Sequence, residues 1–517
     1  MVTLLELLRD GYFPRELPPP FTSAPFANLI FSNSASLPTC LESKFKSNTS
    51  DHNITRVGTL RRKLGIPNPI GQYQLSKEIA TNWNTLDAHI QNSKISVSKP
   101  MTVKDSGRAL APQIRPRFLP ILRASRRLGA KYLLKSDISN FYHSIYTHSI
   151  PWALHGKSVA KQNRSPTLIG NKLDILIRST QDDQTVGIPI GPDTSFLLSE
   201  ILLASVDQVI ISNLGVTPCG FRWADDFELC FSNILEAEVA LNAIESALSD
   251  FELTLNPRKT IIEQLPLPLD DYWAIELKYF NFRTTETAQQ NDLINYFSRA
   301  FDLAKTNPES SVLRYAVARL RSAQIHQSNW PLFQDLMLQC VNCEPGTLPN
   351  VLEHYVRFSQ IGYPVDLDKL EETLNSQIKY HSPLRHGSEV AWSLWGAIAF
   401  QIPLHSKTAQ SINKMDDSVV ALLALDAEQR GLFQSPIDKT NWSQYMTSYA
   451  LTQEQWLLSY EANVKGFMPS RGGGDHVSSN PSFSYLKRNG VYFYDPTKAA
   501  KIIPSAILPF PGGDFYG

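Results

Sequence analysis

The stretch GFRWADDFELCFS, residues 220–232, decides the fold. Residues of high β propensity lead up to Asp225-Asp226, and apolar residues alternate with polar ones after the pair. Alternation on both sides of a short polar turn predicts a β-hairpin. Two adjacent carboxylates at such a turn repel each other at neutral pH, so the pair is costly unless a cation lies beside it.

A third acidic residue ends another β-like run. The segment KYLLKSDI, residues 131–138, predicts an apolar strand that ends at Asp137. Phosphoryl transfer to a nucleic acid uses two divalent cations about 3.5–4 Å apart, held mainly by carboxylate oxygens. Asp137, Asp225 and Asp226 are therefore the predicted catalytic metal ligands, for Mg²⁺ or alternatively Mn²⁺. The other two Asp-Asp pairs lie in polar turns and are predicted to be structural: Asp182-Asp183 and Asp270-Asp271.

The sequence divides into three regions. Residues 1–99 open with a Pro-, Ser- and Asn-rich part that predicts mostly irregular structure. Residues 100–285 mix β-like and helical runs, whereas residues 286–517 carry one helical pattern after another. The predicted fold is an α+β N-terminal half followed by an all-α C-terminal domain, which ends in a Gly/Ser loop and a short β-like segment. The expected helices span 194–210, 234–253, 287–306, 309–326, 330–342, 347–361, 367–379, 387–402 and 416–430.

Composition indicates a globular chain in a reducing compartment. Of 517 residues, 42% are hydrophobic and 19% are charged, and 49 basic residues balance 49 acidic ones. The five cysteines form no disulfide framework, and Cys340-Val-Asn-Cys343 lacks the second Cys or His pair of a zinc site. We find neither a signal-peptide pattern nor a run of about 18 apolar residues that would span a bilayer. We therefore expect a cytoplasmic protein without a membrane partner.

Positive charge is concentrated before the first acidic motif. Residues 108–135 contain eight Arg or Lys and no acid. Arginine pairs with phosphate oxygens, so Arg115 and Arg117 are predicted nucleotide-binding residues, with a solvated surface as the alternative. Lys157 follows a glycine and is predicted to contact phosphate, with a solvated loop as the alternative.

Four motifs in this order resemble the palm of reverse transcriptases over about residues 100–285. They are SDISNFYHSI (136–145), GIPIGPDTSFLLSEILL (187–203), RWADDF (222–227) and LNPRKTII (255–262). The resemblance implies that Tyr142 is the steric gate against a ribose 2′-hydroxyl. It also implies that Pro189 and Gly191 lie in a turn against the incoming nucleotide, and that Lys259 is a catalytic residue near the triphosphate.

A closer resemblance lies in FYHSIYTHSIPWALHGKSVAKQNR, residues 141–164. This run is similar to AbiK-type abortive-infection reverse transcriptases, a family of bacterial and prophage antiphage enzymes, and the similarity extends over about residues 130–265. The resemblance implies a HEAT-like helical C-terminal half and a homo-oligomer, either trimer or hexamer, in the bacterial cytoplasm. It further implies polymerisation of deoxynucleoside triphosphates without a template, begun on a protein tyrosine that stays covalently joined to the single-stranded DNA product. The priming tyrosine is not assigned among the 19 tyrosines.

Two positions depart from templated enzymes. Ile190 stands where those enzymes commonly carry Gln, and an aliphatic side chain makes no polar contact with nucleotide or template. Trp223 stands where Tyr is usual, but the metal chemistry does not need that hydroxyl. Two alternatives remain: an RNA-templated reverse transcriptase, as in retrons or group II introns, and a non-catalytic nucleic-acid-binding scaffold. Retention of all three carboxylates and Lys259 argues against the scaffold.

Overall fold

The computed structural model describes residues 1–500 except 35, 59 and 104–106. The chain folds into two compact units. The first unit comprises residues 1–14, 23–49 and 65–269; the second comprises residues 15–22, 50–64 and those from 270 onward. Each unit is therefore built from three stretches that are not continuous in the sequence.

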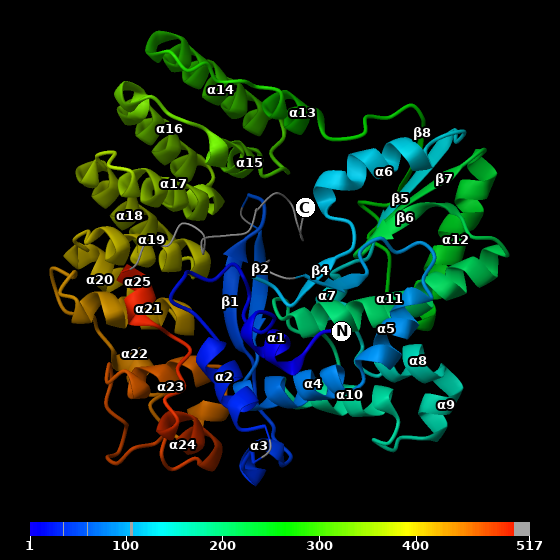
Figure 1. The fold of residues 1–517 in the computed structure, drawn as a ribbon, viewed down its shortest axis with the longest axis horizontal. Coiled ribbons are helices and arrows are strands. Elements are labelled where there is room, and N and C mark those ends of the chain that lie inside the picture. Colours follow the sequence, from blue (N-terminus) through cyan, green and yellow to red (C-terminus); the bar gives the residue numbers. More distant parts are fainter. Residues whose placement is uncertain (35, 59, 104–106, 501–517) are drawn as a thin grey trace. The chain divides into compact units, whose positions relative to one another are not determined.

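A four-stranded antiparallel sheet is the centre of the first unit. Its strand order is β6-β7-β5-β8. The sheet contains β5 (Tyr132–Asp137), β6 (Cys219–Trp223), β7 (Asp226–Phe231) and β8 (Ile261–Gln264). Helix α12 (Ile234–Asp250) packs against β5 and β7 (Figure 1). The predicted strand that ends at Asp137 and the predicted hairpin are both confirmed.

The long helix α11 (Asp193–Leu214) is apolar on nearly all sides and lies inside the first unit. It contacts α12, α8 (Ser149–His155) and α5 (Trp83–Gln91). A helix that is hydrophobic all round is buried in a core or in a membrane. By length and mean hydropathy α11 could cross a bilayer, contrary to the sequence-based expectation, but 83% of its apolar window is buried within the protein.

The first 50 residues contain more helix than expected. Three helices form there: α1 (Leu4–Arg9), α2 (Ala24–Ser32) and α3 (Thr39–Glu42). Thr3 and Glu6 make a reciprocal capping box at the start of α1, which fixes a helix of six residues. Most of the described residues in 1–50 lie outside these helices, so the expectation of mostly irregular structure is confirmed, and the short helices are what it did not include. The remaining elements of the first unit are α4 (Pro69–Thr81), β3 (Pro100–Thr102), β4 (Leu110–Pro112), a 3₁₀ turn (Pro116–Phe118), α6 (Leu119–Arg126), α7 (Phe141–Ser144), α9 (Lys157–Gln162) and α10 (Ile169–Ser179).

The second unit is a succession of helices joined by short turns, in green through red in Figure 1. Alternate helices contact one another: α16 with α18, α17 with α19, α19 with α21, and α21 with α23. The α-helices among its described residues are α13 (Tyr272–Lys278), α14 (Glu286–Thr306), α15 (Val312–Arg319), α16 (Trp330–Cys343), α17 (Leu348–Gln360), α18 (Leu367–His381), α19 (Gly387–Phe400), α20 (Ser406–Ile412), α21 (Ser418–Gln429), α22 (Thr440–Ser443), α23 (Trp456–Val464), α24 (Pro481–Arg488) and α25 (Pro496–Ala500). Six of the seven predicted C-terminal helices are present within about two residues at each end. The helix expected at 309–326 is shorter: α15 ends at Arg319 and is followed by a 3₁₀ turn at Leu320–Ser322. The HEAT-like character of the helices stays a prediction.

Two features of the second unit differ from the sequence-based expectation. The residues after the Gly/Ser loop form α24, capped by the Asn480 side chain, and the expected β-like segment is reduced to an isolated β-bridge between Tyr494 and Phe21. Strand β1 (Ser50–Thr55) pairs with β2 (Arg61–Ile66), so the unit is not all helical. Arg61 of β2 makes a bidentate ion pair with Glu389 of α19, and the unit thus includes residues from the N-terminal hundred.

Candidate active site

Asp225 lies in the two-residue turn of the β6–β7 hairpin. Trp223 pairs with Asp226 across this turn, which leaves Ala224 and Asp225 as the connecting residues. Ala224 has φ +50°, the left-handed region that costs a residue with a Cβ about 1 kcal/mol or more. The turn therefore directs two consecutive carboxylates to one end of the sheet.

Asp137 ends β5 beside this turn. It is paired in register with Asp226 on the neighbouring strand, and it is buried. Asn256 Nδ2 donates a hydrogen bond of 3.0 Å to Asp137 Oδ2, and Lys259 Nζ lies 3.0 Å from the same oxygen. The structure thus brings four predicted residues together: Asp137, Asp225, Asp226 and Lys259. The sequence analysis had assigned no role to Asn256, although it lies in the same motif as Lys259.

The two aspartates of the turn bind their protons more tightly than ordinary aspartates do, so their pKa values are raised. Partial loss of hydration, followed by the charges of Asp226 and Asp137, raises the pKa of Asp225 well above its ordinary value. Partial loss of hydration and the charge of Asp137 also raise the pKa of Asp226, although Lys259 opposes this. A divalent cation would relieve the repulsion, and hard carboxylate oxygens are the donors that Mg²⁺ prefers. The donor set therefore fits a divalent metal ion.

The turn before α11 is packed too closely to accept larger residues. Gly191 has φ +133°, and a Cβ there would lie 2.5 Å from Pro14 Cγ. A Cβ on Gly65 would likewise lie 2.7 Å from Pro189 Cβ. The Ile190 carbonyl accepts a hydrogen bond from the Gly65 backbone N–H, and its side chain is buried. Ile190 therefore belongs to the core of this turn.

Tyr142 lies just after the Asp137 strand and is 8% exposed. Its hydroxyl is 3.4 Å from the Ser199 hydroxyl of α11, and its backbone carbonyl accepts from the Ile188 N–H. These contacts tie the residue predicted as steric gate to both the turn 187–191 and α11.

The chain is similar in sequence to one protein family over part of its length. Residues 78–290 match the family model described as reverse transcriptase (RNA-dependent DNA polymerase). The match covers less than half of the chain, and over these residues the chain is similar to a reverse-transcriptase domain. No curated protein matches the chain in sequence.

The solved structures that are similar to the chain include two telomerases. Apo telomerase from Candida tropicalis matches with 13% identity and a TM-score of 0.31, over 67% of this chain and 68% of the telomerase chain. Telomerase from Candida albicans, in complex with a TWJ fragment of telomeric RNA, matches with 11% identity and a TM-score of 0.29, over 68% of this chain and 67% of that chain.

Five arginines of the basic run at residues 108–135 fall into two groups. Arg108, Arg123 and Arg127 are structural: Arg108 pairs with Asp193, while Arg123 and Arg127 both bind Glu228. Arg115 and Arg117 are exposed, and the Arg117 guanidinium lies 4.7 Å from the centroid of the Phe118 ring. The exposed pair is thus available to a phosphate.

The predicted role of Lys157 has a competing structural explanation. Its Nζ donates to the Asp250 carbonyl at 3.0 Å and lies 4.2 Å from the Trp152 ring centroid. Lys161 also lies over Trp152, and His148 pairs with Asp174 at 2.9 Å. Much of the run 141–164 therefore maintains local packing in the reverse-transcriptase domain.

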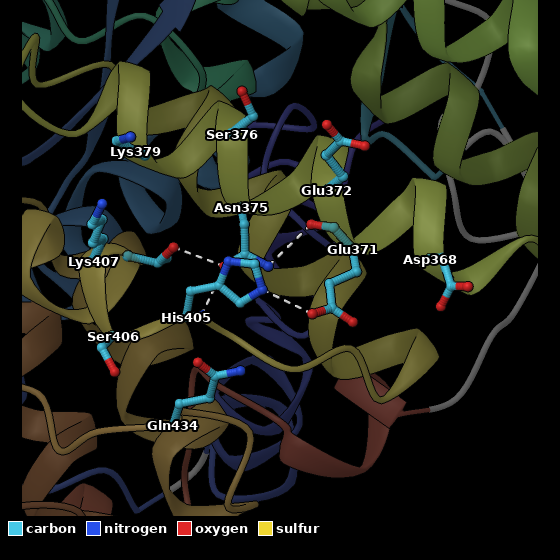
Figure 2. Close-up of a pocket in the computed structure, with 11 residues that line it drawn as sticks. Asp368, Glu371, Glu372, Asn375, Ser376, Lys379, His405, Ser406, Lys407 and Gln434 are labelled. Atoms are coloured by element: carbon cyan, nitrogen blue, oxygen red, sulfur yellow. Dashed lines mark hydrogen bonds and ion pairs between the residues drawn. The ribbon is translucent and has the colours of Figure 1, made fainter.

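Two polar clusters lie in the second unit. An open hollow of about 720 Å³ is formed by α18, α20 and nearby turns (Figure 2). Its charges are mixed, and His405 Nε2 is 2.8 Å from Glu371 Oε1, so the lining does not select one ligand charge. The lining residues are Asp368, Glu371, Glu372, Asn375, Ser376, Lys379, His405, Ser406, Lys407, Thr408 and Gln434.

The second cluster joins His381, His386 and Glu389, with 2.8 Å between the two histidine Nδ1 atoms. Arg61 donates to both oxygens of Glu389, and burial lowers the pKa of His381 to about 4. The guanidinium already neutralises the only carboxylate of the set, so a divalent cation would add uncompensated buried charge. This cluster is better explained as a structural anchor of β2 on α19.

Proposed function

We propose that this protein is an antiphage DNA polymerase, in which the reverse-transcriptase domain joins deoxynucleotides without copying a template. The observation that carries the proposal is the pairing of Asp137 with Asp226 beside the Asp225 turn. The three carboxylates converge, and two of them have raised pKa values. Such a group of carboxylates is suited to bind divalent cations. Such a site matches two-metal nucleotidyl transfer.

The proposed roles follow from the contacts of each residue. Asp137, Asp225 and Asp226 would hold Mg²⁺, or Mn²⁺, which when bound activates the attacking hydroxyl and stabilises charge on the phosphate. Lys259 offsets the charge of Asp137 and lies where it can also approach a triphosphate. Tyr142 would restrict space at the sugar, and Arg115 and Arg117 would contribute positive charge toward the phosphates.

Ile190 supports synthesis without a template. Its side chain is buried, and its backbone carbonyl accepts a hydrogen bond from the Gly65 N–H. Residue 190 therefore presents neither a side-chain amide nor an exposed surface to a template strand. An RNA-templated reverse transcriptase is the second candidate, because residues 78–290 match the family model described as RNA-dependent DNA polymerase.

The resemblance of residues 141–164 to AbiK-type enzymes supports priming on a protein tyrosine and an antiphage role in bacterial cytoplasm, carried out by a trimer or hexamer. A priming hydroxyl must reach solvent, whereas Tyr12, Tyr73 and Tyr494 are buried. Among the tyrosines of the described residues, four have strongly exposed side chains: Tyr272, Tyr279, Tyr380 and Tyr449. These four are the first to test as primers.

The test uses full-length protein incubated with labelled deoxynucleoside triphosphates and Mg²⁺, with and without an added RNA template and DNA primer. The proposal expects label in a high-mass, denaturation-resistant species that forms without template and collapses on protease treatment. Label that appears only with template and primer would establish the templated alternative. Absence of label in every reaction would leave the non-catalytic scaffold as the explanation.

A further inference from the structure

A buried ionic network lies directly behind the acidic turn. The Arg222 side chain is fully buried between two acidic residues of α11. It donates to Asp207 through Nε at 2.9 Å and Nη2 at 2.8 Å, and to Glu200 through Nη1 at 3.0 Å. The network carries one positive and two negative groups, so its charge is not balanced by Arg222 alone.

Three serines complete the network. Ser93 donates to Asp207 at 2.6 Å, while Ser96 and Ser98 donate to the two oxygens of Glu200 at 2.9 and 2.8 Å. The segment that carries them runs alongside β6, because Arg222 N–H donates to the Ile95 carbonyl and Val97 N–H donates to the Arg222 carbonyl. The serine hydroxyls therefore solvate carboxylates that water does not reach.

The same network holds both backbone groups of Ala224. The Ala224 N–H donates to Ser98 Oγ at 2.8 Å, and the Ala224 carbonyl accepts from Arg222 Nη1 at 2.7 Å. Ala224 is the residue with the left-handed φ, and Asp225 follows it directly. A strained backbone conformation persists only where its surroundings impose it.

We propose that Ser98 and Arg222 are positioning residues, which fix the left-handed Ala224 and thereby direct the Asp225 carboxylate toward a bound metal ion. The inference rests on the metal-site role proposed above for Asp225. It also accounts for the buried charges. A buried ion network is commonly no more stable than well-packed apolar residues of the same volume, so stability alone does not explain this one.

The chain offers a matched pair of variants. Ser98→Ala removes the acceptor of the Ala224 N–H together with one donor to Glu200. Ser96→Ala removes a donor to the other Glu200 oxygen and leaves the turn contacts intact. A purely structural role predicts equal effects, whereas a positioning role predicts a loss at Ser98 alone.

The experiment measures Mn²⁺ binding to the full chain by electron paramagnetic resonance, alongside the melting temperature. Loss of one hydrogen bond to the turn should weaken Mn²⁺ binding by roughly fivefold in Ser98→Ala, with Ser96→Ala within about twofold of wild type. Equal Mn²⁺ affinities of the two variants would overturn the inference. If Ser98→Ala does not fold, the variant Ser98→Thr, which retains the hydroxyl, takes its place. A wild-type Mn²⁺ affinity of Ser98→Thr supports the inference, and a fivefold loss of Mn²⁺ affinity overturns it.

Kinetics separate this inference from the proposed function. In an active enzyme, Ser98→Ala should lower kcat at limiting metal ion and recover toward wild type at saturating Mn²⁺, with KM for the nucleotide unchanged. If wild-type protein binds Mn²⁺ but incorporates no nucleotide, the proposed function fails while the difference in Mn²⁺ affinity still tests the positioning role.

Discussion

Asp137 and Asp226 lie opposite each other on adjacent antiparallel strands, as a directly registered pair. Registered cross-strand neighbours have their side chains on the same face, and like charges in this arrangement destabilise a sheet. Asn256 and Lys259 both contact Asp137 and offset part of this cost. The sheet end thus keeps a repulsion between carboxylates that a bound cation would relieve.

Substitution of Asp137 tests this arrangement. Asp137→Asn keeps the shape of the side chain but removes a charged metal ligand, so nucleotide incorporation should fall by at least about 100-fold with little change in melting temperature. The control is Asp182→Asn, at a turn where the aspartate pairs with Lys46. The control should retain full activity, and equal activity of the two variants would contradict the assignment.

The metal-free protein should become more stable when the acidic turn loses a charge. The raised pKa of Asp225 means that the folded state favours the protonated carboxyl, so the contribution of Asp225 to folding stability is largest at low pH and falls as the pH rises toward the raised pKa. Asp225→Asn should therefore raise the melting temperature in EDTA at about pH 7.5 by roughly 3 °C and flatten its fall between about pH 5 and 8.

Glu238→Gln is the control for that experiment, because Glu238 is an exposed carboxylate on α12. Its melting temperature should stay within about 1 °C of wild type. Added Mg²⁺ should stabilise wild type more than Asp225→Asn, since the variant has lost a ligand. A lower melting temperature for metal-free Asp225→Asn would mean that the carboxylates are not in repulsion.

The turn at Gly191 should be intolerant of a methyl group. Gly191→Ala combines a positive φ with a contact to Pro14, and should lower the free energy of unfolding by about 3 kcal/mol. Gly129→Ala also has a positive φ, but no neighbour lies within 4 Å, so it should cost only about 1 kcal/mol. Urea denaturation of the two variants separates strain from steric contact, and equal costs would refute the close packing.

The basic run should separate into stability and binding residues. Arg123→Met breaks a bidentate pair with Glu228 and should lower the free energy of unfolding by roughly 1–3 kcal/mol. Arg117→Met should change stability by less than about 0.5 kcal/mol, weaken binding of single-stranded DNA and lower its salt dependence by about one charge. Fluorescence anisotropy at several salt concentrations measures the binding, and unchanged affinity would exclude Arg117 from the nucleic-acid surface.

Local patterns in the sequence predicted where the acidic residues lie better than they predicted the contacts that support them. The hairpin, the strand that ends at Asp137 and the helix 234–250 each follow from periodicity within about 20 residues. The distinction between Arg117 and Arg123 could not be predicted, because Glu228 lies 105 residues from Arg123 along the chain. The inclusion of Arg61 in the helical unit depends on Glu389, which is 328 residues away.

The support of the turn was missed for the same reason. Ser98 is an ordinary polar residue in sequence, and its partners Glu200 and Ala224 lie 102 and 126 residues further along. Glu200 and Asp207 occur in a helix whose apolar character predicts burial, so a buried acid within such a helix was the available signal of an internal network.

The most direct test of the central claim is incorporation of labelled deoxynucleotides by wild-type protein and by the double variant Asp225→Ala with Asp226→Ala, in Mg²⁺ and without template. The account predicts labelled, protein-linked DNA from wild type and none from the double variant, with both proteins folded by circular dichroism. Equal incorporation by the two proteins would contradict the assignment of the acidic turn as the polymerising centre.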